Sequence, residues 1–347
     1  MNKEFVRWGI LGCGDVTERK CGPGLQKASG SQLAAVMRRD AAKAEDYAKR
    51  HNVPFWTSDA DALINRPDVD IVYIAAPPGA HLELALRVCA AGKPCCVEKP
   101  MARSAVESVA MLDAFQRAGL PLFVAFYRRG MERFTLARDL LGQGRLGTLT
   151  GISYTFKAPR QPDLNPANLP WRLNAADAGA GLFYDLGSHA LDILDFFLGP
   201  LENVSGHTAN HGSPYDVEDT VAMSFTAMGT PGVARWNFAA FETRDEIELE
   251  GTEGKLTLSC FGVEPVRLET RAGVEQFPVE PPAHVHQPLI QTIVDEMRGL
   301  GKCPSTAASA LRTMRVMDAV LTSYYGGRDD DFWTRPDSWP GRKRAQS

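Results

Sequence analysis

Three side chains capable of acid–base chemistry recur at helical spacing in the segment AGAGLFYDLGSHALDILDFFLG, residues 178–199. Asp185, His189 and Asp192 stand at positions i, i+4 and i+7, so a helix beginning near Leu182 would place them along one face. The rest of this helix is apolar nearly all round, which indicates burial. Because charged groups in a dry core are costly, this face is expected to line a cleft.

Two other interpretations of this row of side chains stay open on residue types alone. A buried hydrogen-bonded network would serve packing only, and that is the commoner case among proteins in general. Asp185, His189 and Asp192 could also ligate a metal, because acids and histidine at helical spacing suit that role. No metal is predicted here.

Glu98 and Lys99 are a second chemical signal. They directly follow the short apolar run of residues 94–97, which is typical of the end of a buried strand, and they precede Pro100. The residue types alone leave open why two opposite charges stand there.

The elements that must position these groups fall into two halves. Up to about Tyr127, short apolar runs alternate with helical segments, the pattern of β-α-β units and a parallel sheet. Strands are expected at residues 6–11, 33–37, 54–56, 69–76, 94–97 and 121–126. Residues 1–127 are therefore predicted to form a dinucleotide-binding Rossmann domain.

Helix signals in this half support that prediction. Asp40 is a suitable N-cap for a helix over residues 40–51, and Ser104 with Glu107 fits a capping box for a helix over residues 104–119. Helix ends are marked by Gly92 and Gly119.

The segment GILGCGDVT ends the first strand at Gly12 and Gly14, followed by Asp15 and Val16. A dinucleotide-binding fold needs a tight turn here and a bare backbone that a pyrophosphate can approach. Thr17 replaces the third glycine of the motif, so an ordinary strand-to-helix turn is equally compatible. The glycines and proline of residues 21–24 are expected to break the following helix early.

Arg38 and Arg39 follow the second strand, where an NAD enzyme usually presents a carboxylate to the ribose. A guanidinium suits a 2′-phosphate by charge and by bidentate geometry, which favours NADP. The alternative is a pair of solvated arginines, and a register slip of two residues would bring Asp40 into place for NAD.

The long central strand ends at Ala76 and Pro77, and the two consecutive prolines stop the ladder at the carboxyl edge of the sheet. Ligands bind at that edge in open α/β sheets. His81 heads the next helix, where a place beside the cofactor and a plain surface position are equally compatible with the sequence.

The second half, residues 128–326, is predicted to be an α/β domain with a large, mostly antiparallel open sheet. After a proline-rich loop, apolar residues alternate with polar ones in the runs at 220–227, 234–241, 245–251 and 255–260. The other face of the sheet carries more polar groups and scattered aromatics such as Phe241, and could meet solvent or a second subunit. Two helices, residues 287–298 and 305–325, precede a polar tail at 327–347.

Composition excludes several functional classes. The chain has 347 residues, 44% hydrophobic and 23% charged, with a formal net charge of −4. This balance argues against a nucleic-acid or anionic-membrane surface and favours a small-molecule partner. The start of the chain lacks the pattern of a signal peptide, no run is long enough to span a membrane, and the seven cysteines fit reduced thiols, so a cytoplasmic protein is expected.

Four segments together resemble the Gfo/Idh/MocA family of oxidoreductases. They are GILGCG, PPGAHLELALRVCAAGKPCCVEKPMA, WRLNAADAGAGLFYDLGSHALDILDFFLG and IELEGTEGKLTL, in the order of the family and over most of the chain. The resemblance implies a Rossmann domain followed by an α/β domain with an open sheet. It implies hydride transfer between NAD(P) and a carbohydrate carbon, and association into a homodimer or homotetramer through that sheet.

The resemblance also implies roles for individual residues. Glu98 and Lys99 match the family's Glu-Lys-Pro motif at the nicotinamide end of the cofactor, and Lys99 would orient the substrate hydroxyl. His189 matches the usual acid/base, a duty that suits a group titrating near pH 6.5. Asp185 would hold the reacting hydroxyl, with Asp192 in support.

Four further residues match more weakly. Trp171 and Arg172 correspond to a family element near substrate and cofactor, while Tyr127 and Arg129 are candidates for the wall of the substrate pocket. The sequence departs from the family at Thr17 and at the break of residues 21–24. It departs also at Pro78, which replaces an asparagine, and in the glycine run before Asp185, where alanine is substituted.

The sequence therefore predicts an NADP-preferring dehydrogenase or reductase that acts on a sugar or polyol, with NAD as a possible cofactor. A dehydrogenase of cyclic diols, of the dihydrodiol type, is the nearest alternative. A glycosidase that uses a bound nicotinamide transiently and a non-catalytic NADP-sensing regulator are the alternatives from other classes.

Overall fold

The structure is a computed structural model that describes residues 4–161, 164–165, 167–329 and 331–342. The chain divides into two compact units. Unit 1 comprises Met1–Ala102, Glu107–Met131 and Pro282–Ala310, and unit 2 comprises Arg103–Val106, Glu132–Pro281 and Leu311–Ser347.

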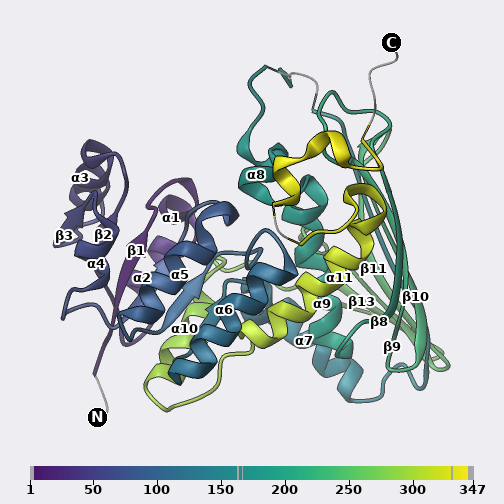
Figure 1. Cartoon of the computed structure of the whole chain (residues 1–347). Coiled ribbons are helices and arrows are strands. Elements are labelled where there is room, and N and C mark those ends of the chain that lie inside the picture. The colour runs from purple at the N-terminus through teal and green to yellow at the C-terminus, as the bar shows by residue number, and fades with distance from the viewer. Residues whose placement is uncertain (1–3, 162–163, 166, 330, 343–347) are drawn as a thin grey trace. The chain divides into compact units, whose positions relative to one another are not determined.

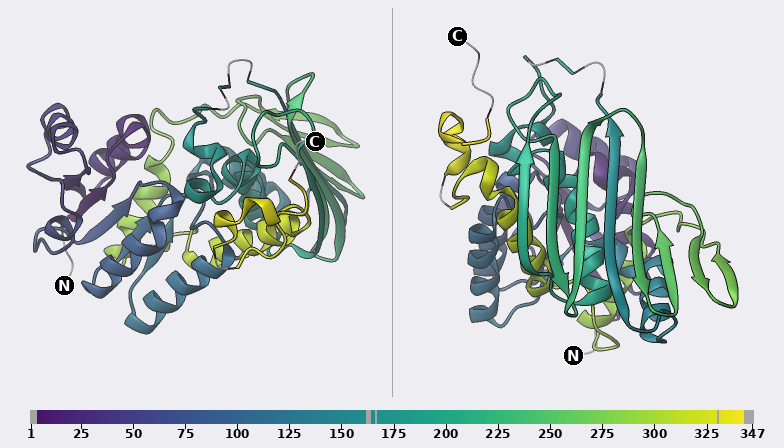
Figure 2. Two further views of the ribbon diagram at one scale, coloured as in Figure 1. Left: turned by 45° about the horizontal axis from the view of Figure 1, so that its top comes forward. Right: turned by 90° about the vertical axis from the view of Figure 1, so that its right-hand side faces the viewer.

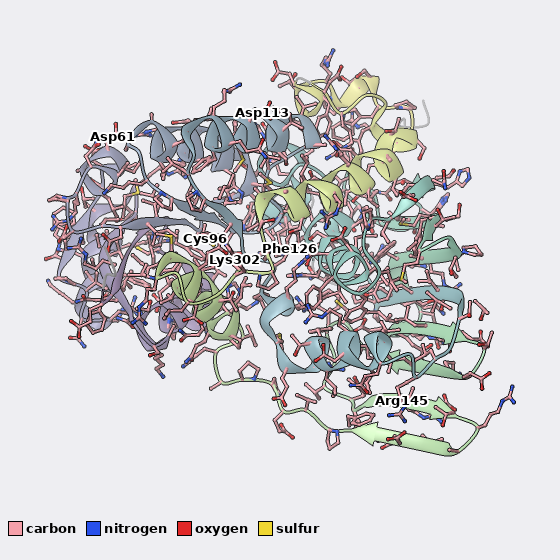
Figure 3. The ribbon with its side chains drawn as sticks, turned by 90° about the horizontal axis from the view of Figure 1, so that it is seen from below. Asp61, Cys96, Asp113, Phe126, Arg145 and Lys302 are labelled. Atoms are coloured by element: carbon pink, nitrogen blue, oxygen red, sulfur yellow. The ribbon has the colours of Figure 1, made fainter. Side chains whose placement is uncertain are left out.

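Unit 1 is built on a six-stranded parallel sheet in the order β3-β2-β1-β4-β5-β6 (Figure 1). This is the strand order of dinucleotide-binding Rossmann folds, whose ligands lie where the order reverses, here between β1 and β4. The strands are β1 (Val6–Leu11), β2 (Ser31–Met37), β3 (Phe55–Thr57), β4 (Ile71–Ile74), β5 (Cys95–Val97) and β6 (Leu122–Val124). Both faces of the sheet are covered, so the strands are buried: Cys96 of β5, labelled in Figure 3, is 1% exposed.

The connecting helices of unit 1 begin and end largely at the predicted signals. They are α1 (Asp15–Arg19), α2 (Cys21–Lys27), α3 (Ala41–Arg50), α4 (Ala60–Ile64), α5 (His81–Ala90) and α6 (Ala105–Ala118), whose first two residues belong to unit 2. The Asp40 carboxylate caps α3 by accepting from the Lys43 amide. Gly92 and Gly119, with φ of 71° and 65°, follow the ends of α5 and α6 as predicted.

Helix α10 (Gln287–Met297) belongs to unit 1, whereas the sequence placed it in the second domain. Its apolar face, including Ile290 and Ile293, is buried. Gly24 of α2 lies so close to α10 that an added Cβ would stand 2.7 Å from the side chain of Ile290. The physical reason is tertiary packing, because an amphipathic helix can cover any apolar surface that the chain reaches.

Unit 2 contains an eight-stranded sheet in the order β14-β13-β12-β11-β7-β10-β9-β8, in which only the β7–β10 pair is parallel. The strands are β7 (Leu149–Pro159), β8 (Glu202–Ala209), β9 (Thr220–Ala227), β10 (Thr230–Ala240), β11 (Arg244–Gly251), β12 (Gly254–Leu258), β13 (Val266–Thr270) and β14 (Gly273–Phe277). The helices of this unit are α7 (Glu132–Gly142), α8 (Ala175–Ala178), α9 (Ser188–Leu198) and α11 (Ala307–Tyr325), whose first four residues belong to unit 1.

The two faces of this sheet differ as the alternation predicted. Val221, Met223 and Phe225 are buried, and Val320 of α11 packs against Gly206 of β8. The opposite face lies open toward the viewer in the right panel of Figure 2. Phe241 is fully exposed. Association through this face stays a prediction.

Two local features differ from the sequence analysis. The helix predicted from Leu182 begins as a π-helical turn, η4 (Phe183–Gly187), and continues as α9. The described part of the C-terminal segment is packed rather than a free polar tail: Phe332 and Trp339 are 2% and 6% exposed, and the Trp339 indole donates to the Phe332 carbonyl. Although the segment is polar on average, its aromatic side chains provide enough apolar area for it to pack against the rest of the unit.

All seven cysteines are free thiols. Within the described residues, no helix combines the length and the apolar character that crossing a membrane requires.

Candidate active site

The glycine loop after β1 has the geometry that a dinucleotide pyrophosphate requires. Gly12 has φ of +93°, and an added Cβ would lie 3.1 Å from the backbone nitrogen of Ala76, which follows β4. A Cβ on Gly14 would meet no atom closer than 3.9 Å. The loop therefore leaves open the space that a phosphate would fill, and Asp15 and Val16 follow it as the first residues of α1.

Thr17 fits the position of the missing third glycine. Its hydroxyl donates to the Gly14 carbonyl at 2.8 Å and accepts from the Gly14 amide at 2.9 Å, so the side chain closes the loop. It is fully buried. The helix does break early, at Lys20, and residues 21–24 then start α2. Gly22 is required there, because a Cβ would come 2.1 Å from the Thr17 carbonyl oxygen.

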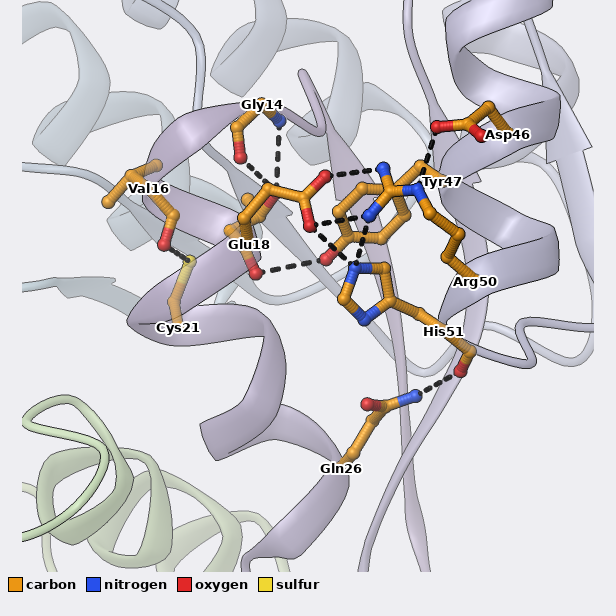
Figure 4. Close-up of polar contacts among 10 residues, drawn as sticks. Gly14, Val16, Glu18, Cys21, Gln26, Asp46, Tyr47, Arg50 and His51 are labelled. Atoms are coloured by element: carbon orange, nitrogen blue, oxygen red, sulfur yellow. Dashed lines mark hydrogen bonds and ion pairs between the residues drawn. The ribbon is translucent and has the colours of Figure 1, made fainter.

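A cluster of polar side chains fixes α1, the helix that follows the glycine loop (Figure 4). Glu18 of α1 accepts hydrogen bonds from Arg50 at 2.7 and 2.9 Å and lies 2.7 Å from the ring of His51. The Arg50 guanidinium lowers the pKa of Glu18 to about 2. The Tyr47 hydroxyl donates to the Thr17 carbonyl. The short first helix is thus fixed to the end of α3, a contact that the sequence did not predict.

Arg38 and Arg39 directly follow β2, which ends at Met37 as predicted. Arg38 is half-buried and Arg39 exposed, and neither forms an ion pair with any residue that the structure describes. The Asp40 carboxylate is occupied by capping α3 and by an ion pair with Lys43. The register slip that would have favoured NAD is absent.

His81 joins two loops at the carboxyl edge of the unit 1 sheet. Its Nε2 lies 2.7 Å from the Ala76 carbonyl oxygen, and its Nδ1 lies 3.2 Å from the carbonyl oxygens of Pro100 and Met101. The side chain is fully buried, so the plain surface position is wrong. Burial lowers its pKa to about 4, against the effect of the hydrogen bonds to these three carbonyl oxygens. A place beside the cofactor stays a prediction, as it does for Ala76 and Pro77.

Glu98 turns inward at the end of β5. The residue is 7% exposed, and its carboxylate accepts hydrogen bonds from the Tyr73 hydroxyl at 2.7 Å and from the Lys99 amide at 3.2 Å. Burial raises its pKa, against the effects of the Tyr73 hydrogen bond and the Lys99 charge. The carboxylate therefore anchors the backbone that presents Lys99, which is the arrangement that a chemically active lysine needs.

Two residues distant in sequence complete this cluster. Nδ1 of His286 lies 3.3 Å from the Tyr73 hydroxyl and 3.8 Å from Glu98. Ligand-type atoms of Cys21, Glu98 and His286 lie within 4.8 Å of one another, a grouping that sequence spacing could not reveal. The Tyr73 hydroxyl contacts both Glu98 and His286, so hydrogen bonds explain why these side chains lie together.

Tyr127 and Arg129, the weaker candidates, lie in the short helix η2 (Tyr127–Gly130) and are both buried. The Tyr127 ring stacks on His286 with centroids 4.3 Å apart. Arg129 donates to the Pro304 carbonyl. Their role in a substrate pocket stays a prediction.

In unit 2, the structure brings Asp185 together with Arg172. The Arg172 Nε donates to the Asp185 carboxylate at 3.1 Å, and the Arg172 guanidinium lies 4.5 Å from the Trp171 ring centroid. The Asp185 side chain is 16% exposed, whereas Asp192 is almost fully buried. Asp185 is therefore the more accessible carboxylate of the predicted row.

His189 lies on the first turn of α9, where the π-turn passes into the α-helix. Its ring is 5% exposed and packs edge-on against Phe261 with centroids 5.9 Å apart. The π-turn changes the expected register between Asp185 and His189, because its hydrogen bonds span one residue more than those of an α-helix. Such turns are frequent at functional sites.

The interrupted glycine run before Asp185 keeps glycine where the chain needs it. A Cβ on Gly179 would lie 2.7 Å from the Arg103 carbonyl oxygen, and one on Gly181 would lie 2.6 Å from the Glu218 carbonyl oxygen. The Gly181 amide also donates to the Glu218 carboxylate. The alanines stand only at the intervening positions, so this departure from the family leaves the turn intact.

The buried carboxyl group of Glu218 should make the stability of the protein depend on pH. Burial raises its pKa to about 7, although Tyr325 and Gly181 hydrogen-bond to it. The folded state then binds the proton more tightly than the unfolded chain, so this group's contribution falls as pH rises from about 4.5 to about 7. Relative to Glu218→Gln, wild type should lose about 3 kcal/mol of unfolding free energy over that range. Urea unfolding at several pH values tests this, and parallel profiles would contradict it.

Comparison with known proteins decides the family. Residues 6–126 match the model of an oxidoreductase family with an NAD-binding Rossmann fold, and residues 134–257 match the model of the GFO/IDH/MocA C-terminal domain. Oxidoreductase P35 from Formosa agariphila is 33% identical over 90% of this chain and 97% of its own length. The chain belongs to the Gfo/Idh/MocA family of oxidoreductases.

Several other similar proteins are named for reactions on sugars or sugar derivatives. The 1,5-anhydro-D-fructose reductase of Ensifer adhaerens is 27% identical over 94% of this chain and 99% of its own length. The solved structure of levoglucosan dehydrogenase with NADH and levoglucosan matches with a TM-score of 0.81 at 22% identity, over 92% of this chain and 97% of that one. The predicted family and fold class are confirmed, and the protein is an oxidoreductase with an NAD-binding domain.

Proposed function

We propose that the protein is an NADP-preferring dehydrogenase or reductase that moves a hydride between nicotinamide C4 and the carbon of a sugar or polyol hydroxyl. The observation that carries the proposal is the match of both chemical motifs, Glu98–Lys99–Pro100 and Asp185 with His189, in a chain that spans nearly the whole length of sugar-active relatives.

The cofactor supplies the hydride acceptor or donor when it is bound. Gly14 would admit its pyrophosphate, since even a Cβ there would meet no atom closer than 3.9 Å, and Gly12 with its positive φ makes the tight turn before it. Arg38 and Arg39 would bind the 2′-phosphate. Neither guanidinium is held in an ion pair with a described carboxylate, so both can turn to a phosphate without breaking one.

The residues of the chain divide the proton chemistry among them. Lys99 donates a hydrogen bond to the reacting hydroxyl and orients it. His189 would accept the hydroxyl proton as the alcohol carbon is oxidised. Asp185, held by Arg172, accepts a hydrogen bond from a neighbouring sugar hydroxyl. The reverse direction reduces a ketone with the proton from His189.

The function is tested with a panel of aldoses, ketoses, inositols and cyclic diols, each with NADP and NAD in parallel. Reduced nicotinamide should accumulate with at least one sugar or polyol, faster with NADP. Turnover of a cyclic diol alone would replace the sugar by the dihydrodiol substrate class. Cleavage of a glycoside without net cofactor reduction would indicate the glycosidase instead, and a protein that binds NADP without any turnover would indicate the regulator.

Cofactor preference makes a separate prediction. Replacing Arg38 and Arg39 together by serine should raise the Kd of NADP about 10²- to 10⁴-fold, because each charge-assisted hydrogen bond is worth about 1.5–3 kcal/mol and both are removed. The Kd of NAD should change little. Calorimetric titration measures both, with Lys43→Ala as a control that removes a nearby exposed charge. Tighter binding of NAD than NADP by the wild-type protein would contradict the preference.

A further inference from the structure

Arg328 is a buried arginine in the segment that the sequence assigned to a polar tail. Its side chain is 1% exposed and forms an ion pair with Asp318 of α11, with Nε 2.7 Å from the carboxylate. Removing a guanidinium from water is costly unless every donor finds a partner. The hydrogen-bond partners of Arg328 therefore indicate which parts of the chain the buried guanidinium holds together.

The other two nitrogens of Arg328 bind two backbone carbonyls that are far apart in sequence. Nη1 donates to the Gly179 carbonyl at 3.0 Å, and Nη2 donates to the Arg103 carbonyl at 2.8 Å. Gly179 precedes the turn that carries Asp185, and Arg103 stands four residues after Lys99 in the chain. One planar group thus ties together the chain segments next to both chemical motifs.

Neighbouring contacts fix the same two segments. The second carboxylate oxygen of Asp318 accepts from the Ala105 amide at 2.7 Å. The Arg103 side chain donates to the Ala176 carbonyl, and its guanidinium lies 3.6 Å from the ring centroid of Trp333. Gly179 has φ of +92° and touches the Arg103 carbonyl so closely that no side chain would fit. The segments therefore meet backbone to backbone, with Arg328 bridging them.

Aromatic rings enclose the guanidinium. Its central carbon lies 4.9 Å from the ring centroid of Tyr184, 5.1 Å from that of Tyr325 and 4.3 Å from that of Phe332. Tyr184 is the residue directly before Asp185. A lysine could provide the charge but not three donors in fixed directions.

We propose that Arg328 is a positioning residue for the reaction: it fixes the backbone of residues 103–105 to Gly179 and so holds the turn that presents Asp185 and His189. The inference rests on the proposed function for the roles of those two residues. Catalytic groups must be held within about 0.5 Å of their productive geometry, and a displacement of about 1 Å can cost a factor of about 10² in rate.

The test compares Arg328→Lys and Arg328→Ala with Leu268→Ala, which removes a fully buried side chain from β13, a strand paired with β12 and β14. In both Arg328 variants kcat should fall about 10- to 100-fold at a temperature where the protein is folded, while the Kd of NADP changes less than about threefold. Added guanidinium at a non-denaturing concentration should restore part of kcat in Arg328→Ala. Leu268→Ala should lose thermal stability but retain kcat.

A second measurement reports on the stability of the turn itself and needs no catalysis. Hydrogen exchange at the amides of residues 180–187 should be faster in Arg328→Lys than in Leu268→Ala when the two are matched for distance below their unfolding temperatures. This measurement separates failure of the inference from failure of the proposed function, because it needs no substrate. Unchanged exchange at this turn, or an unchanged kcat in folded Arg328→Lys, would overturn the inference.

Discussion

Replacing His189 by alanine is expected to lower kcat for sugar oxidation by about 10²- to 10⁴-fold, because the hydroxyl proton then has no positioned acceptor. Lys99→Ala is expected to cause a loss of the same order, since the reacting hydroxyl is no longer oriented. Steady-state kinetics at several pH values measure both. In the His189 variant, the limb of the pH–rate profile due to an essential base should also disappear.

The control for this pair is His207→Ala. His207 lies exposed on β8, on the open face of the sheet, and has no role in the proposed chemistry. Its removal should leave kcat within about twofold of wild type. A His189→Ala enzyme that retains the wild-type kcat and pH profile would exclude His189 as the acid/base.

Replacing Gly12 by alanine is expected to weaken dinucleotide binding about 10- to 100-fold. Two effects add: alanine at a φ of +93° is strained by roughly 1–2 kcal/mol, and its Cβ would press on the Ala76 backbone at 3.1 Å. Relief of this contact requires the loop to shift, and this loop is the segment that would admit the pyrophosphate. The Kd of NADP measured by calorimetry tests this expectation.

Gly92→Ala is the matched control. Gly92 has φ of +71°, lies in the same unit and has open space around the position of a Cβ. This variant should lose a similar amount of stability while its Kd for NADP stays at the wild-type value. Equal weakening of NADP binding in both variants would show that general destabilisation, and not the glycine loop at Gly12, is responsible.

The parts of the fold that sequence reasoning predicted depend on local signals. The parallel sheet of unit 1 follows from the alternation of apolar runs and helices, and the N-cap at Asp40 follows from the chemistry of one side chain. The antiparallel sheet follows from period-two alternation in strands such as β9. These signals lie within a few residues of the element that they specify.

The features that the prediction missed depend on contacts between distant segments. His286 joins the cluster around Glu98 from more than 180 residues away, and Arg328 reaches Arg103 over 225 residues. Nothing in the local pattern around Arg328 distinguishes a buried arginine from a solvated one. The π-turn before α9 was missed for a different reason, since a single extra residue in a turn leaves the apolar pattern nearly unchanged.

The most direct test of the hydride-transfer proposal follows one atom. The protein is incubated with NADP and with the sugar from the panel that gives the highest rate, prepared with deuterium on the reacting carbon, and the cofactor is analysed by mass spectrometry. The account predicts one deuterium on C4 of the reduced nicotinamide for each ketone formed, and a rate of this transfer about 10²- to 10⁴-fold lower in Lys99→Ala. Reduced cofactor that carries no deuterium, or product formed with no deuterium in the nicotinamide, would contradict it.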